Sequence, residues 1–257
     1  MAILLASACA SASARADLLP ARDTADVGVE GSWSIGLIAP LTYAISDGLE
    51  VQTHPLFFLV APNFVVRAEH GQALGFRFAG EYGAFCPTPA MRLTQGYLFP
   101  SWAETGGQIG WVVVPHAGIV ATRGNRYERT LSFSVDAALG VPLTHGNPIS
   151  FGGVAPVDDE LAPVTTGFRV RLNATYDAAI LSWLRARAWL TLSLHGRNPS
   201  PVGVSAGGGF DLGVYKAWRV TAGFMWWNAD TGAIDEASHA HVRSNDFFPT
   251  LDFIWAG

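Results

Sequence analysis

Residues 247–257 read FFPTLDFIWAG, and every second residue from Phe247 to Trp255 is apolar. The positions between them include Thr250 and Asp252, so apolar and polar side chains alternate. A period of two places all the apolar side chains on one face of a β-strand. The chain therefore ends on an amphipathic strand, whereas the last residues of a soluble domain usually fray in water.

The same alternation recurs along the chain. Between residues 131 and 141, for example, Phe133 and Val135 alternate with Ser134 and Asp136. The pattern predicts strands over residues 29–39, 48–57, 62–69, 73–82, 90–98, 108–121, 127–141, 164–177, 185–195, 202–214, 218–227 and 247–256. This is about twelve strands, although prolines near the second and third segments also allow roughly ten to fourteen. Most segments approach the roughly 9–11 residues that a tilted strand needs to cross a bilayer.

The composition points away from an ordinary soluble protein. Only 14% of the residues are charged, against about 25% in a typical globular domain. A length of 257 residues fits one large β domain. The net charge of −5 makes nucleic acid an unexpected partner, because nucleic-acid binding favours a basic surface. Because no run of about 18 apolar residues is present, we expect no membrane-spanning helix.

The first residues, MAILLASACASASARA, resemble a secretory signal peptide. They run from an apolar stretch to Ala14-Arg15-Ala16, which has the A-x-A form of a cleavage site, but no charged region precedes the apolar part. Cys9 leaves open a lipid-anchored start. Removal of the signal would leave Cys86 as a single cysteine, so we expect no internal disulfide. The predicted organisation is a signal peptide over 1–16, a short N-terminal segment over 17–28 and one barrel domain over 29–257.

Alternating strands fit either a soluble sandwich with its apolar face inward or a membrane barrel with that face outward. The polar faces favour enclosure, because small residues such as Gly207, Gly209 and Gly213 accompany Asp211. Their charges are also nearly balanced, as an enclosed interior requires. The candidate lumen network comprises Glu50, His54, Arg67, Arg77, Glu81, Asp136, Arg169, Arg171, Asp177, Arg187, Asp211, Arg219 and Asp252. Arg92 and Arg185 fall on the same predicted faces.

Connection lengths and aromatic positions also favour a membrane barrel. The longest predicted loops, 99–107, 142–163 and 228–246, follow strands five, seven and eleven, so all three lie at the same end. The short connection near residue 71, after the third predicted strand, is an exception. Aromatic residues near strand ends, as in interfacial girdles, are Tyr97, Phe99, Trp102, Trp183, Trp218, Trp226, Trp227, Phe247 and Phe248.

The signal-like start, the alternating strands and the final strand make this sequence similar to bacterial outer-membrane β-barrel proteins. The resemblance implies a closed antiparallel up-and-down transmembrane barrel in the bacterial outer membrane. In that superfamily the last strand usually ends in an aromatic residue that the barrel-assembly machinery reads. The resemblance therefore gives Phe247, Leu251, Phe253 and Trp255 this role, although Ala256 and Gly257 follow. Lipid and the assembly machinery are its implied partners, and no activity follows from it.

Three functions fit these observations. The first is an outer-membrane barrel that acts as a narrow pore for small solutes or is largely plugged. The second is a lipid-modifying enzyme of the outer membrane, although no G-x-S-x-G motif is present and His54 and His195 read as lumen residues. The third is a soluble secreted β protein.

Metal binding has only weak candidates in the sequence. His239 and His241 form H-x-H in an acidic loop, and the acidic residues 158–160 could hold a divalent cation or be solvated. We expect no cofactor, and the sequence leaves the oligomeric state open.

Overall fold

The computed structural model describes residues 19–98, 108–146, 155–196, 202–215, 217–234, 238 and 241–257. Within these ranges, twelve strands form one antiparallel sheet that closes because β5 pairs with β6 as well as with β4. The prediction of a closed, all-β barrel of about twelve strands is confirmed. The predicted signal peptide over 1–16, as well as Phe99 and Trp102, lies outside the described residues.

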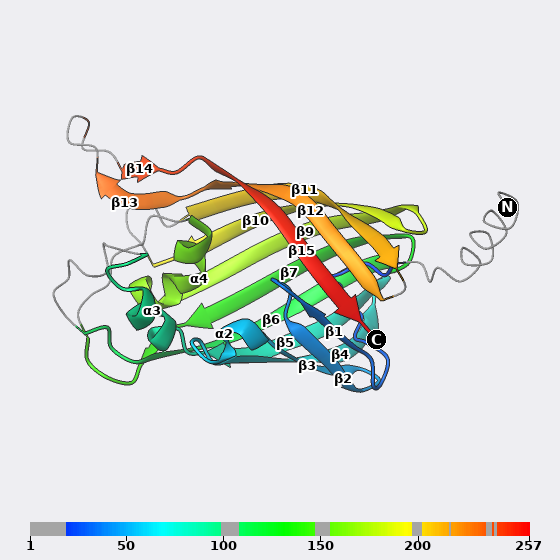
Figure 1. The fold of residues 1–257 in the computed structure, drawn as a ribbon, viewed down its shortest axis with the longest axis horizontal. Helices are drawn as coiled ribbons and strands as arrows, with labels where there is room; N and C mark the ends of the chain where they lie inside the picture. Colours follow the sequence, from blue (N-terminus) through cyan, green and yellow to red (C-terminus); the bar gives the residue numbers. More distant parts are fainter. Residues whose placement is uncertain are drawn as a thin grey trace, which may run out of the picture.

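Neighbouring barrel strands follow chain order, and the last strand closes against the first (Figure 1). The barrel strands are β1 (Trp33–Gly36), β2 (Leu41–Ser46), β3 (Leu49–Thr53), β4 (Asn63–Ala73), β5 (Phe76–Phe85), β6 (Val112–Asn125), β7 (Arg129–Leu139), β9 (Phe168–Leu181), β10 (Leu184–His195), β11 (Val202–Tyr215), β12 (Trp218–Asn228) and β15 (Asp246–Ala256). The connections contain α2 (Pro55–Phe58), α3 (Thr88–Thr94), β8 (Val141–Pro142), α4 (Ala155–Thr166), β13 (Asp230–Ile234) and β14 (His241–Arg243).

Two errors in the predicted strands cancel in the count. The strand predicted over residues 90–98 is wrong, because helix α3 occupies this region with a proline in its first turn, where the missing N–H costs nothing. Met91 of this helix packs against Ile109 and Leu161. Strand β2 was not predicted, because its lumen face includes the apolar Ala44 and the alternation is therefore weak.

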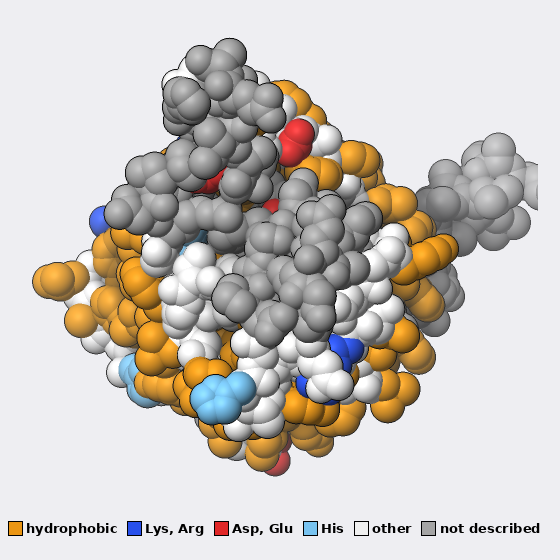
Figure 2. Space-filling view, turned by 90° about the vertical axis from the view of Figure 1, so that its left-hand side faces the viewer, with side chains coloured by type: hydrophobic (Ala, Val, Ile, Leu, Met, Phe, Trp, Pro, Cys, Tyr) orange, Lys and Arg blue, Asp and Glu red, His pale blue; other side chains and the backbone are white. Residues whose placement is uncertain are grey.

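The apolar faces point outward. In β7, Phe133 is 45% exposed while Ser132 is 4% exposed, which reverses the arrangement of a soluble domain. In β15, Leu251 is 51% exposed and Asp252 is 7% exposed. Hydrophobic side chains surround the circumference of the barrel when it is viewed along its axis (Figure 2). The fold is therefore that of an outer-membrane barrel rather than of a soluble sandwich.

The two ends of the barrel differ. Connections 47–48, 74–75, 126–128 and 182–183, with residue 217, form one end, the turn end. The connection 54–62 and the described parts of 86–111, 140–167 and 229–245 form the loop end with its helices (Figure 1). The predicted exception near residue 71 is wrong, because Gly71 lies within β4. Counting β2 makes β4 the fourth strand, and its short turn joins the others.

The final strand closes the barrel through the predicted strand near residues 29–39. Ile35 pairs with Trp255, and the Trp33 N–H donates to Gly257 O at 2.8 Å. The Trp255 ring also contacts Trp33 edge-on at 4.8 Å and stacks on Trp218 at 5.6 Å. Across the part of the chain that the structure describes, no helix has the length and apolar character needed to cross a membrane.

Candidate functional site in the plugged lumen

Residues 19–28, which precede the first strand, lie inside the barrel at its turn end, and we call them the N-terminal plug. The Ala21 N–H donates to Arg126 O, and the Ala25 N–H donates to Thr122 Oγ1, both at 2.7 Å. Three plug carbonyls accept from arginines of the wall: Leu19 O from Arg185 at 2.7 Å, Pro20 O from Arg219 at 2.8 Å, and Thr24 O from Arg67. The sequence analysis predicts a short N-terminal segment over 17–28 but does not place it in the lumen.

Two ion pairs hold the plug through forked contacts. Arg22 of the plug reaches both carboxylate oxygens of Asp211, at 3.1 and 3.2 Å. Asp26 accepts from Nε and Nη2 of Arg77, at 2.5 and 2.9 Å. Because Asp211 and Arg77 belong to distant strands of the sheet, the plug is fixed to more than one side of the lumen.

A third ion pair, between Asp23 and Arg187, has a single hydrogen bond instead of a fork. Arg187 donates through Nη2 to one Asp23 oxygen, while its buried Nε has no hydrogen-bond partner among the described residues. The Asp23 side chain is 66% exposed, and its backbone is left-handed with φ of 53°. The Arg187 guanidinium holds the pKa of the Asp23 carboxyl well below its usual range. Arg187 also lies over the Trp189 ring, with its Cζ atom 5.6 Å from the ring centroid.

The wall beneath the plug carries its own pairs. Arg185 and Asp177 are 2.6 Å apart and each 1% exposed, and Arg219 contacts Asp211 at 3.3 Å. On the other side, Arg67 lies 2.7 Å from Glu81. Glu50 completes this second group at 3.5 Å from Arg67.

A further charged group lies toward the loop end, where α4 meets the wall. Arg171 contacts Asp159 of α4 at 2.8 Å and also pairs with Glu160. Arg169 contacts Asp136 at 3.2 Å. Burial would raise the pKa of Glu160, but the guanidinium groups of Arg171 and then Arg169 lower it to about 2. Asp159 and Glu160, which we considered as cation ligands, therefore dock α4 onto arginines.

Two residues of the predicted network stand apart from these groups. The carboxylate of Asp252 accepts from the N–H groups of Ile38 and Ala39, both at 2.9 Å. His54 lies at the start of α2, where its Nε2 is 2.7 Å from Ile38 O. Both residues therefore fasten the connection between β1 and β2 rather than joining the ion pairs.

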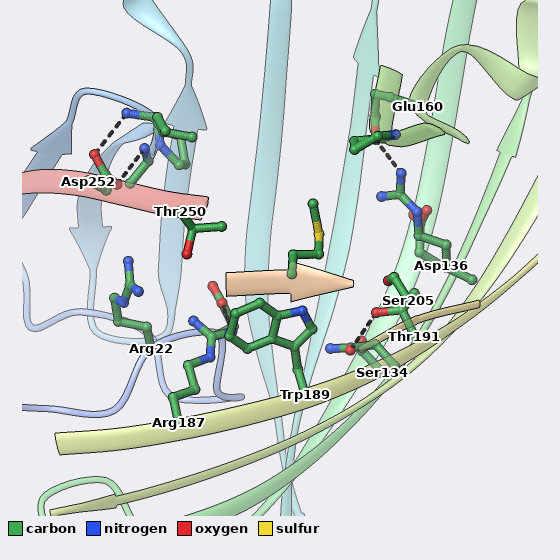
Figure 3. A pocket seen from close by; sticks show the side chains of 18 of the residues that line it. Arg22, Ser134, Asp136, Glu160, Arg187, Trp189, Thr191, Ser205, Thr250 and Asp252 are labelled. Atoms are coloured by element: carbon green, nitrogen blue, oxygen red, sulfur yellow. Dashed lines mark hydrogen bonds and ion pairs between the residues drawn. The ribbon is translucent and has the colours of Figure 1, made fainter. Parts of the chain in front are cut away.

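A cavity of about 750 Å³ lies between the plug and α4. Arg187 and Trp189 project into it from β10, with Asp136 and Glu160 to one side and Thr250 and Asp252 to the other (Figure 3). Charges of both signs face this space. The arrangement can therefore bind a small polar or charged molecule, or hold water within the barrel.

Aromatic residues in the lumen were missed by the sequence analysis. Trp227, which we predicted in the outer girdle, is 6% exposed and lines the cavity, so that prediction is wrong. Trp189 lies against Gly207 of the paired strand, where a Cβ atom would be 2.3 Å from the ring. The run of three glycines at 207–209 was the signal, because a strand with no side chain leaves room for a neighbouring ring.

His116 is a lumen histidine with a carboxylate neighbour, but Ser134 on the paired strand lies too far away to act as its nucleophile. His116 Nδ1 is 3.4 Å from Asp136 Oδ2. However, His116 pairs with Ala138, and Ser134 lies four residues along β7, or about 13 Å at roughly 3.3 Å per residue. A nucleophile and its base need a hydrogen bond. His195, which the sequence analysis places in the lumen, is buried on β10.

The metal candidates in the acidic loop fall largely outside what the structure covers. His239 is outside the described residues, and only the backbone of His241, in β14, is described. Among the residues that are described, no three His, Cys, Asp or Glu side chains are grouped to hold a metal ion.

No protein-family model matches this chain, and no curated protein matches its sequence. The chain is similar in structure to in-vitro folded OmpT, an outer membrane protein of Vibrio cholerae, in its trimer form. That match has 10% sequence identity and a TM-score of 0.44, and it covers 87% of this chain and 64% of that one. A second structure of in-vitro folded OmpT from Vibrio cholerae gives 9% identity and a TM-score of 0.43, covering 94% and 73%. This chain thus spans less than two thirds of the first of these proteins.

Proposed function

We propose that this protein is a bacterial outer-membrane barrel that is closed at rest, and that small solutes pass only when the N-terminal plug moves. The plug is the observation that carries this proposal. It lies across the turn end and is bonded to several strands of the wall through both its backbone and its side chains. Of the two states that the sequence allows, a narrow pore and a largely plugged barrel, this arrangement favours the plugged one.

The contacts of the plug suit a closure that can open. One partner of each forked ion pair reaches solvent: the side chain of Arg22 is 23% exposed and that of Arg77 is 27% exposed, against 1% for Asp211 and 14% for Asp26. Ion pairs that reach solvent contribute little each, typically up to about 1 kcal/mol. A segment held by several such contacts is stable as a whole, while any one of them can be broken at low cost.

Location and partners belong to the same proposal. The turn end would face the periplasm and the loop end the outside, after export directed by residues 1–16. The apolar face of β15, with Phe247, Leu251, Phe253 and Trp255, would be read by the barrel-assembly machinery and then contact lipid. The cluster of Trp33, Trp218 and Trp255 supports an interface at the turn end, because such rings prefer the membrane–water boundary.

Single-channel recording in planar bilayers tests this function. The wild type should stay closed for most of the recording, and Asp26→Asn, which loses the fork to Arg77, should open more often. The matched control is Glu30→Gln, which removes the same charge from an exposed position just beyond the plug. Deletion of residues 19–28 should give a continuously conducting barrel. Equal, steady conductance in the wild type and both plug variants would refute a closed resting state.

A further inference from the structure

The loop-end half of β15 has a free edge. β15 pairs with β1 only at residues 254–256, and the last backbone bond on that side runs from the Leu37 N–H to Phe253 O at 3.1 Å. Residues 246–252 pair with β12, but no described strand pairs with their other edge. Pro249 lies in this half, and proline is tolerated at an edge because it has no N–H to pair. The wall is thus incomplete beside β15.

Short strands explain why the gap forms here. β1, β2 and β3 have 4, 6 and 5 residues, whereas β4 has 11. These three strands end well below the loop end, where α2 follows β3 (Figure 1). The contacts of Asp252 with the Ile38 and Ala39 N–H groups form the lower border of the gap.

The lumen cavity reaches this border. Its lining includes Ile38 and Pro40 from the β1–β2 connection, Leu251 from β15 and Val65 from β4. A free strand edge within a bilayer is costly unless it lines an aqueous or protein-filled space. The cavity supplies that space, and its lining by residues of β15, β4 and the β1–β2 connection points to a lumen that opens sideways between β15 and β4.

The outer rim of this opening is apolar. Leu251 is 51% exposed, Ile38 is 60% exposed, and Phe64 on the outer face of β4 is 57% exposed. An outward apolar surface on a barrel contacts lipid acyl chains. A molecule that enters through the side opening therefore comes from the hydrocarbon layer and has an apolar portion.

The inner end of the route is cationic and aromatic. Arg187 presents a buried Nε, which has no acceptor in the described part of the chain, beside the Nη2 that binds Asp23. A guanidinium binds a carboxylate best by donating two parallel hydrogen bonds. Asp23 occupies one of these two positions. Because the Asp23 side chain is exposed and its backbone is left-handed, Asp23 is a replaceable occupant. Trp189 and Met225 provide an apolar surface in the same cavity.

We propose that the cavity binds a fatty-acid-like amphiphile, with its carboxylate on Nε and Nη2 of Arg187 in place of Asp23 and its acyl chain extending through the opening beside β15. The inference rests on the proposed function in one respect, because Asp23 belongs to the plug. Carboxylate binding would release one plug contact. Fatty-acid-like amphiphiles would then be the class of molecule that loosens the plug of the closed barrel.

Calorimetric titration of the detergent-solubilised full chain with octanoate tests this site, with octanol and octylamine as probes of equal chain length. Octanoate should bind saturably, and the other two should show only partition into micelles. Arg187→Gln should weaken octanoate binding about tenfold or more, because a charge-assisted pair is lost. Asp23→Asn should strengthen it several-fold, because the internal competitor becomes neutral. Equal binding of octanol, or an unchanged affinity in Arg187→Gln, would refute the site.

A matched pair on β15 tests the route. Leu251→Trp places a large ring at the border of the opening and should slow or weaken octanoate binding. Phe253→Trp adds a similar ring on the same outward face, but within the bonded seam, and should bind as the wild type does. Equal binding by both variants would refute lateral entry. Because these measurements do not depend on conductance, they can fail while the plug proposal stands, and the reverse also holds.

Discussion

Arg185 and Asp177 form an ion pair across strands β10 and β9, with Nε and Oδ1 2.6 Å apart and both side chains 1% exposed. Arg185 also donates through Nη1 to Leu19 O of the plug and to Tyr127 O of a turn, at 2.7 and 3.2 Å. One guanidinium therefore joins two wall strands, a turn and the plug. Because the apolar side chains of this barrel face outward, polar contacts of this kind hold its interior together.

Arg185→Leu should destabilise the barrel by about 3–5 kcal/mol, because it leaves the Asp177 carboxylate buried without its cation. Heat-modified gel mobility reports the change: the temperature at which the folded band disappears should fall. Arg129→Leu is the control, because Arg129 is exposed at the start of β7.

The double variant Asp177→Leu/Arg185→Leu separates an unpaired charge from lost packing. Replacing a buried ion pair by apolar residues is often close to neutral. We therefore expect the double variant to be more stable than Arg185→Leu alone. If the double variant is equally unstable, the bonds from Arg185 to Leu19 O and Tyr127 O dominate instead.

The face that each strand presents could be predicted from the sequence, because one period-two pattern decides every side chain of a strand. Phe133 and Asp136 lie outside and inside as expected, and so do Phe253 and Asp252. The arginine and carboxylate groups of the lumen follow from this pattern. Which of them pair does not, because the pairing depends on register and on the shape of the lumen.

The plug and α3 could not be predicted by the same reasoning. Residues 19–28 have no periodic pattern, and their position depends on arginines such as Arg185 and Arg77 that are distant in sequence. Met91 and Arg92 alternate as strand residues would, yet α3 forms because Met91 packs with Leu161 of α4. Arg92 then donates to Ile109 O instead of facing the lumen. Tertiary contacts decide the position of the plug and the conformation of α3.

Gly207→Ala should disturb the cavity, because a Cβ atom there would lie 2.3 Å from Trp189 Cζ2 and 2.6 Å from Phe224 O. Overpacking of this kind typically costs about 1–3 kcal/mol. Gly208→Ala is the matched control, since its Cβ would be 3.4 Å from the nearest atom, Arg187 O. Thermal unfolding followed by tryptophan fluorescence should show a lower midpoint for Gly207→Ala only. Equal midpoints would mean that the Trp189 ring moves freely.

Trp255→Ala should weaken the closing seam, because the ring contacts both Trp33 and Trp218. Each aromatic pair contributes about 0.5–1.5 kcal/mol beyond the buried area. The folded fraction on unboiled gels, after refolding into detergent, should therefore fall. Trp183→Ala removes a ring of nearly equal exposure, 46% against 45%, from another turn-end position. A similar loss in both variants would assign the effect to interfacial tryptophans in general rather than to the seam.

Acid should loosen α4 from the wall. The pKa of Glu160 in the folded protein, about 2, lies below its ordinary value of 4.5, so its ion pairs stabilise the fold fully above about pH 4.5. This contribution is lost as the pH falls from there through about 2, when the carboxyl takes up a proton. Thermal midpoints measured from pH 7 to pH 2 should therefore separate the wild type from Glu160→Gln at neutral pH and converge in acid. Glu128→Gln, at an exposed turn position, should follow the wild type throughout. A constant difference between the wild type and Glu160→Gln at every pH would show that charge on Glu160 is not what docks the helix.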